Sequence, residues 1–194
     1  MRIKIVELND EEIKEIYTKH MVNDFPVSEV KPLEVILQGK KLGHYQCFGM
    51  YEDNALMAYA FMANADNKTA VLLDYLAVIS DARGKGYGTR MLRELKKHYL
   101  DKCETKVLII EAESIKSSKN DAEKQIRERR IRFYRNNDLL EQDYFSVVFG
   151  TEFSILYLYI DEYVEDKDLI KDVYSEIYHA ILEDSVYEKN IFIR

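Results

Sequence analysis

The sequence predicts a fold of the α/β or α+β class. Two apolar runs between Tyr45 and Ala63 flank a set of turn residues, and a third run begins at about Thr69, which predicts a three-stranded antiparallel meander. An amphipathic helical stripe then separates the third run from the apolar run Val107–Ile110. A strand, a helix and a further strand in this order predict a βαβ-type layer beside the meander.

The segment before the meander is predicted to be mainly helical. A short alternating run at the N-terminus predicts a strand, and Asn9 is placed to cap a helix that continues to about His20. Pro26 and Pro32 interrupt the next stretch, and a second helical stripe begins at Leu33. We expect this region to form a lid or a wall of a ligand site.

The segment after Ile110 predicts two helices and a hairpin. A helix is expected over residues 121–136, and two strand-like runs over 144–149 and 153–160 are joined by turn residues. A last apolar stripe predicts a helix between Asp166 and about Asp184.

Charge and composition narrow the function classes. The chain carries 35 acidic and 28 basic residues, a formal net charge of −7, which disfavours nucleic acid and anionic membranes as partners and suits a cationic acceptor. No apolar run reaches the length of a membrane helix, and no signal peptide is recognisable, so we expect a cytoplasmic protein. Cys47 and Cys103 have no paired spacing, which predicts neither a disulfide framework nor a zinc site.

A glycine-rich loop follows the third strand of the meander. Gly84, Gly86 and Gly88 let the backbone approach a ligand closely, and the helix that starts immediately afterwards directs its free N–H groups to the same place. Arg83 and Lys85 add positive charge. The loop therefore predicts a pyrophosphate site, and its spacing fits neither a P-loop nor a Rossmann fingerprint.

Arg83, Gly86 and Gly88 occupy the defining positions of R/Q-x-x-G-x-G/A, and the segment thereby resembles the GNAT superfamily of N-acetyltransferases. The strands before the motif and the helix after it extend the resemblance over roughly residues 1–160. It implies a mixed, mainly antiparallel sheet of about seven strands flanked by helices. The expected domain covers residues 1–162, and residues 163–194 form a C-terminal helical extension packed on it.

The resemblance also implies acetyl-CoA as the donor, with no metal. Backbone N–H groups from Gly84 to Thr89 would hold the pyrophosphate, and Leu76 and Val78 would pair through their backbones with the pantetheine arm. A backbone N–H near Val78 would stabilise the oxyanion. The residues assigned to coenzyme binding are Leu76, Ala77, Val78, Arg83, Gly84, Lys85, Gly86, Tyr87, Gly88, Thr89 and Arg127.

Residues 127–139 resemble the second coenzyme motif of the family, which implies Tyr134 as the acid that protonates the leaving thiolate. A phenol with an ordinary pKa of about 10 can protonate a thiolate whose conjugate acid has a pKa of about 8.5. The segment departs from the family pattern at Arg127, Arg130 and Asp138. Its arginines either reach coenzyme phosphates or solvate a helix face.

Two carboxylates are candidates for the base that deprotonates the acceptor. Glu111 and Glu113 lie two residues apart at the end of a buried strand, so both face one side of the sheet. Asp74, an acid within an apolar run, is a third candidate. For each of the three, a structural ion pair or cap is an alternative interpretation.

The sequence thus predicts an acetyl-CoA-dependent N-acetyltransferase that acts on a primary amine by direct attack in a ternary complex. This reaction needs no covalent enzyme intermediate, so it requires no nucleophilic cysteine. The alternative is a non-catalytic acyl-CoA-binding or interaction module with the same fold. A homodimer is compatible with either prediction.

Overall fold

The computed structural model describes residues 3–65, 67–161 and 167–194. In this part of the chain eight strands form one sheet, in the order β1, β2, β3, β4, β5, β7, β6, β8. The strands are β1 (Ile3–Glu7), β2 (Tyr45–Glu52), β3 (Ala55–Asn64), β4 (Ala70–Val78), β5 (Val107–Glu113), β6 (Leu140–Val148), β7 (Thr151–Tyr159) and β8 (Ile191–Ile193). The α-helices are α1 (Asp10–Ile16), α2 (Val22–Asp24), α3 (Leu33–Leu42), α4 (Tyr87–Lys102), α5 (Asp121–Arg135), α6 (Lys167–Ile181) and α7 (Asp184–Asn190).

The chain groups into two compact units. The first comprises the residues up to Asn64 together with Leu73–His98, and the second comprises Ala65–Leu72 together with Tyr99–Arg194. The predicted domain boundary between residues 162 and 163 lies outside the described residues. None of the helices in the described ranges combines the length and the apolar character needed to cross a lipid bilayer.

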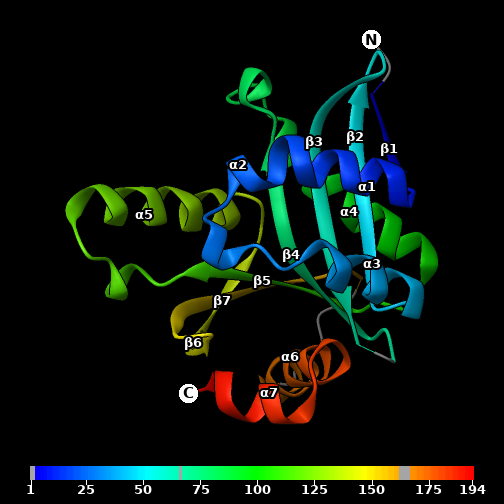
Figure 1. Cartoon of the computed structure of the whole chain (residues 1–194). Coiled ribbons are helices and arrows are strands. Elements are labelled where there is room, and N and C mark those ends of the chain that lie inside the picture. Colours follow the sequence, from blue (N-terminus) through cyan, green and yellow to red (C-terminus); the bar gives the residue numbers. More distant parts are fainter. Residues whose placement is uncertain (1–2, 66, 162–166) are drawn as a thin grey trace. The chain divides into compact units, whose positions relative to one another are not determined.

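The predicted meander corresponds to β2, β3 and β4, which are neighbours in the sheet in that order, and β1 lies on the other side of β2. Strands β1, β2 and β3 pair antiparallel, and Asp53 and Asn54 make the β2–β3 turn with φ values of 47° and 71°. Helices α1 and α3 lie on one face of β2 and β3, and α4 lies on the other (Figure 1). The mixed helix and strand architecture predicted from the sequence is therefore confirmed.

The N-terminal helix differs from its prediction at its C-terminal end. Asn9 caps it as expected, since its Oδ1 accepts a hydrogen bond from the Glu12 backbone N–H at 3.0 Å. After α1 the chain widens into a π-helical turn, η1 (Tyr17–Met21), and then continues as α2. Phe25 is extended, with φ −126° and ψ 149°, because the residue before a proline avoids the helical region.

The second unit contains β5, β7, β6 and β8, all paired antiparallel. The predicted hairpin is present as β6 and β7, with Phe149 and Gly150 in the turn at φ 47° and 81°. The β6–β7 register shifts between Glu141 and Phe145. The residues between these two positions therefore leave the regular ladder.

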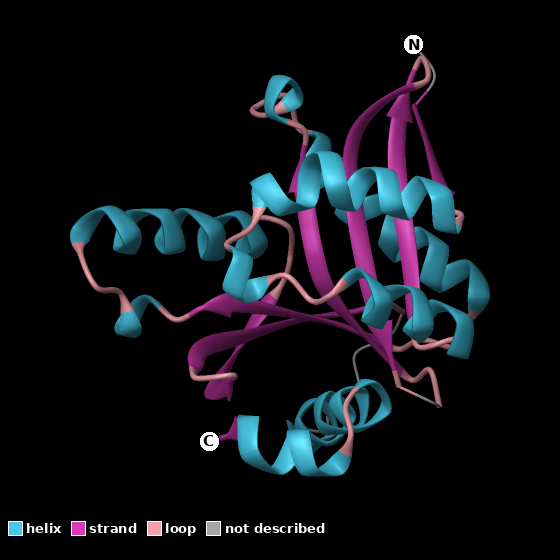
Figure 2. Cartoon of the chain, viewed as in Figure 1, coloured by secondary structure: helices cyan, strands magenta, loops and turns pink. Residues whose placement is uncertain are grey.

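The sheet has eight strands, which corrects the expected number of about seven. The extra strand is β8, which pairs with β6 from Ser146 to Val148. Figure 2 shows α7 running directly into this short strand, so the C-terminal extension is not only helical. Three residues are too few for an alternating pattern to identify a strand.

Candidate active site

The glycine loop of the first unit has a backbone that only glycine adopts readily. Gly84 and Gly86 have φ values of +75° and +85°. A Cβ added to either would meet no atom within 4 Å, so the space beside both residues is open. The Gly86 carbonyl accepts a hydrogen bond from the Arg90 N–H at 3.0 Å and begins α4. An open glycine backbone at a helix N-terminus fits a pyrophosphate.

The Arg83 side chain connects this loop to two other segments. Its Nε donates to the Val78 carbonyl at 3.1 Å, and one Nη donates to the Asp24 carboxylate at 2.7 Å. The other carboxylate oxygen of Asp24 accepts a hydrogen bond from the Tyr59 hydroxyl at 2.9 Å. Arg83, the first residue of the motif, therefore connects the glycine loop to the end of β4 and to the end of α2.

The C-terminal part of β4 offers a partly exposed strand. The strand is buried from Ala70 to Leu73, whereas Leu76, Ala77 and Val78 are partly exposed. Asp74 is held by the Lys31 Nζ at 2.7 and 2.9 Å and by the Tyr45 hydroxyl at 2.5 Å. Asp74 is thus held in an ion pair of the kind expected by the alternative interpretation, and its role as a base stays a prediction.

Glu113 and Arg127 are brought together in the second unit. The Arg127 side chain is only 5% exposed, and its guanidinium donates to four oxygens. These are Ser114 O at 2.7 Å, Ser117 Oγ at 2.9 Å, Glu113 Oε1 at 2.7 Å and Glu123 Oε1 at 3.1 Å. Arg130 donates to the second Glu113 oxygen at 3.2 Å. Arg127 thus joins the end of β5 to the start of α5, and its contact with the coenzyme stays a prediction.

Replacing Arg127 with methionine is expected to lower the free energy of unfolding by about 2 kcal/mol, because Ser114 and Glu113 lose buried, charge-assisted hydrogen bonds. Urea denaturation measures the change. Arg129→Met on the exposed side of α5 is the matched control and should change stability by less than about 0.5 kcal/mol. An equal loss in both variants would contradict the prediction, and a loss of coenzyme affinity in Arg127→Met alone would support the predicted coenzyme contact.

Glu111 has different partners from Glu113. The Tyr178 hydroxyl lies 2.8 Å from each of its carboxylate oxygens, and the Tyr174 hydroxyl donates to Oε1. Both tyrosines belong to α6. The two carboxylates predicted as bases are therefore held by helices on different parts of the chain.

Tyr134 lies in the last turn of α5 and is 7% exposed. Burial raises the pKa of its hydroxyl to about 12, although the nearby Arg130 acts in the opposite direction. The phenol is therefore protonated at neutral pH, as an acid catalyst must be.

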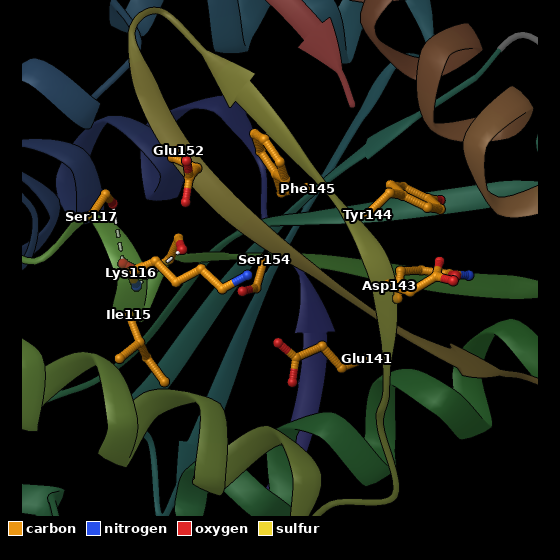
Figure 3. Close-up of a pocket in the computed structure, with 11 residues that line it drawn as sticks. Ile115, Lys116, Ser117, Glu141, Asp143, Tyr144, Phe145, Glu152 and Ser154 are labelled. Carbon is orange, nitrogen blue, oxygen red and sulfur yellow. Dashed lines mark hydrogen bonds between the residues drawn. The ribbon is translucent and has the colours of Figure 1, made fainter.

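A pocket of about 400 Å³ is present in the second unit. It lies between η4 (Ile115–Ser117), the irregular part of β6 and the start of β7. Figure 3 shows Lys116 extended toward Ser154, with Glu141 and Glu152 on either side. None of the residues predicted for catalysis or coenzyme binding lines this pocket. In the described ranges no group of three or more His, Cys, Asp or Glu side chains is arranged to hold a metal ion.

The sequence profile described as the acetyltransferase (GNAT) family matches residues 11–136, which include the glycine loop, β5 and α5. The chain belongs to this family. No curated protein sequence matches it.

Solved structures of GNAT proteins share the fold of this GNAT protein. The ribosomal-protein-S18-alanine N-acetyltransferase from Escherichia coli has a TM-score of 0.61 at 16% identity, covering 85% of this chain and 98% of its own. A putative acetyltransferase from Salmonella typhimurium, solved with its cofactor acetyl-CoA, has a TM-score of 0.59 at 17% identity, covering 86% and 98%. A spermidine N-acetyltransferase variant from Vibrio cholerae has a TM-score of 0.63 at 8% identity, covering 84% and 96%.

Several partners of the residues predicted for the site of this GNAT protein were not identified from the sequence. Asp24 binds Arg83 and in turn accepts a hydrogen bond from Tyr59, and Tyr174 and Tyr178 bind Glu111. An acid before Phe25 and tyrosines on an apolar helix carry no local signal for such roles. Only long-range packing reveals them.

Proposed function

We propose that this GNAT protein transfers the acetyl group of acetyl-CoA to a primary amine of a small molecule or a peptide. The observation that carries the proposal is the open glycine backbone at Gly84 and Gly86, at the start of α4. Family membership and the neighbour solved with acetyl-CoA support coenzyme A over a nucleotide. The neighbours named for an alanine of a ribosomal protein and for spermidine support an amine as the acceptor.

When bound, acetyl-CoA would supply an activated thioester, whose acyl carbon forms a bond to the amine nitrogen as the bond to sulfur breaks. The N–H groups of residues 84–89 would hold the pyrophosphate, and the partly exposed strand Leu76–Val78 would receive the pantetheine arm. Glu111 or Glu113 would accept the proton of the acceptor ammonium. Tyr134 would donate its hydroxyl proton to the departing sulfur.

The net charge of −7 favours cationic acceptors, which extends the proposal to polyamines and to peptide N-termini or lysines. The test is a panel of such amines with acetyl-CoA, in which acceptor-dependent thiol release and the mass of one added acetyl group are measured together. Thermal shift with coenzyme A, ATP and NAD measures the donor site separately. Coenzyme A should stabilise the protein by about 2.7 kcal/mol at a hundredfold excess over Kd.

Two results would contradict the proposal. If ATP or NAD stabilised the protein and coenzyme A did not, the assignment of the loop would be wrong. If coenzyme A bound and no amine accelerated thiol release, the chain would be an acyl-CoA-binding module. Release of thiol with acetylation of one amine class would support the proposal and identify the acceptor.

A further inference from the structure

Helix α6 places two tyrosines on one carboxylate of β5. Tyr174 and Tyr178 lie four residues apart, so both project from the same side of the helix, and their rings meet edge to face at 5.2 Å. The Tyr178 hydroxyl lies 2.8 Å from both oxygens of Glu111, and the Tyr174 hydroxyl contacts Oε1. Tyr174 is also hydrogen-bonded to Ser146 of β6 at 2.9 Å.

These contacts come from outside the region that defines the family. The family profile ends at residue 136, whereas Glu111 lies within it and α6 lies beyond it. Tyr174 and Tyr178 are 0% and 1% exposed, so two polar hydroxyls have been buried against one carboxylate. Burial of this kind is unfavourable unless the hydroxyls are hydrogen-bonded, which Glu111 and Ser146 accomplish.

We infer that Tyr174 and Tyr178 are positioning residues that hold Glu111 ionised and oriented as the base of the acetyl transfer. The inference rests on the proposed function and deepens it. It makes α6 part of the catalytic apparatus. Glu111 takes one proton from the acceptor ammonium and becomes a neutral acid, which leaves the amine nitrogen with the electron pair that forms the new bond.

Hydrogen bonds from two phenols favour the charged form of a carboxyl group and counteract the effect of burial. The Tyr174 phenol keeps its proton and can donate it in a hydrogen bond, because burial and the adjacent Glu111 raise its pKa well above the ordinary value.

Two of the described residues beside the group formed by Tyr174, Tyr178 and Glu111 are uncharged. Ser146 on β6 and Ile155 on β7 carry no charge, and Ile155 is directly opposite Glu111 in the ladder. Glu113, two residues along the same strand, is ion-paired with Arg127 and Arg130. Among the described contacts, the two tyrosines bind Glu111 and do not bind Glu113.

The test uses Tyr174→Phe, Tyr178→Phe and the double variant. The dependence of kcat/KM on pH is measured with the amine found in the acceptor screen. Carboxyl carbons of labelled glutamate are titrated by NMR in parallel, with Glu111→Gln used to assign the Glu111 signal. Loss of one hydroxyl should raise the pKa of the Glu111 carboxyl, and move the acidic limb of the rate profile upward, by about one pH unit. The double variant should show a larger shift than either single variant.

Tyr187→Phe is the matched control. Tyr187 belongs to α7 and hydrogen-bonds Ser175 of α6 at 2.8 Å, so its loss perturbs the same extension without touching Glu111. We expect the acidic limb of this variant to stay in place. Melting temperatures are recorded for all variants, so a purely structural contribution is seen as a lower Tm without a shifted limb.

An unshifted limb and an unshifted Glu111 titration in the double variant would overturn this inference, while activity of the unaltered protein would still support the proposed function. Equal shifts in Tyr187→Phe would also overturn it. Absence of acetyl transfer by the unaltered protein would instead overturn the proposed function, and with it the role of Glu111 as a base.

Discussion

Gly86→Val is expected to raise the Kd for coenzyme A about 100-fold. Gly86 has φ +85°, where a β-branched residue is strained, and its side chain would enter the open space beside the loop. The expected loss corresponds to about 2.7 kcal/mol and combines backbone strain with exclusion of the pyrophosphate from the N–H groups of α4. Isothermal titration calorimetry with coenzyme A measures it directly.

Gly150→Val is the matched control for this prediction. Gly150 in the β6–β7 turn has φ +81°, and a Cβ there also meets nothing within 4 Å. Both substitutions therefore introduce the same kind of strain, and both should lower the melting temperature. Only Gly86→Val should weaken coenzyme binding. If the Kd of Gly86→Val stayed within threefold of the unaltered protein, or if Gly150→Val weakened coenzyme A binding equally, the assignment of the loop to the coenzyme site would be wrong.

Tyr134→Phe is expected to lower kcat by about 100- to 1000-fold, with the Kd for coenzyme A unchanged. The substitution keeps the buried ring of Tyr134 and removes only the proton that would reach the departing sulfur. Steady-state kinetics with the identified acceptor measures kcat. With a donor whose leaving thiol is more acidic, such as a phenyl thioester, the substitution should lower kcat less. The thiolate of such a donor is stable without protonation.

The pKa of about 12 adds a further expectation for Tyr134. A group with a raised pKa keeps its proton until the pH approaches that value. Between pH 7 and about pH 10 the acid function should therefore not titrate, and a decline of kcat in this range has another origin. An unchanged kcat in Tyr134→Phe would exclude this residue as the acid and leave protonation of the thiolate to water.

The sequence predicts most backbone elements of this protein but few of its side-chain contacts. The meander, the glycine loop, the β6–β7 hairpin and the long helices were predicted because each depends on a local pattern of apolar, turn or capping residues. The π-turn η1, the short helix α7 and the three-residue strand β8 were not predicted. These elements are too short to carry a periodic signal, and β8 exists only because β6 lies beside it.

For the carboxylates of the candidate site, the sequence gives the candidates and the structure gives their partners. The sequence predicts Glu111 and Glu113 as bases on equal grounds, since both follow an apolar run and lie on one side of a strand. The described contacts separate them: Tyr174 and Tyr178 bind Glu111, whereas Arg127 and Arg130 bind Glu113. Asp74 is the third candidate, and its carboxylate accepts hydrogen bonds from Lys31 and Tyr45.

The sequence alone determined the strand, glycine loop and helix of residues 70–102, because each follows from neighbours a few residues apart. It also determined the family, through Arg83, Gly86 and Gly88. Tertiary structure alone decided the partners of the charged side chains. Arg83 meets Asp24 across 59 positions and Tyr178 meets Glu111 across 67, and no local pattern encodes contacts that form only when distant segments pack.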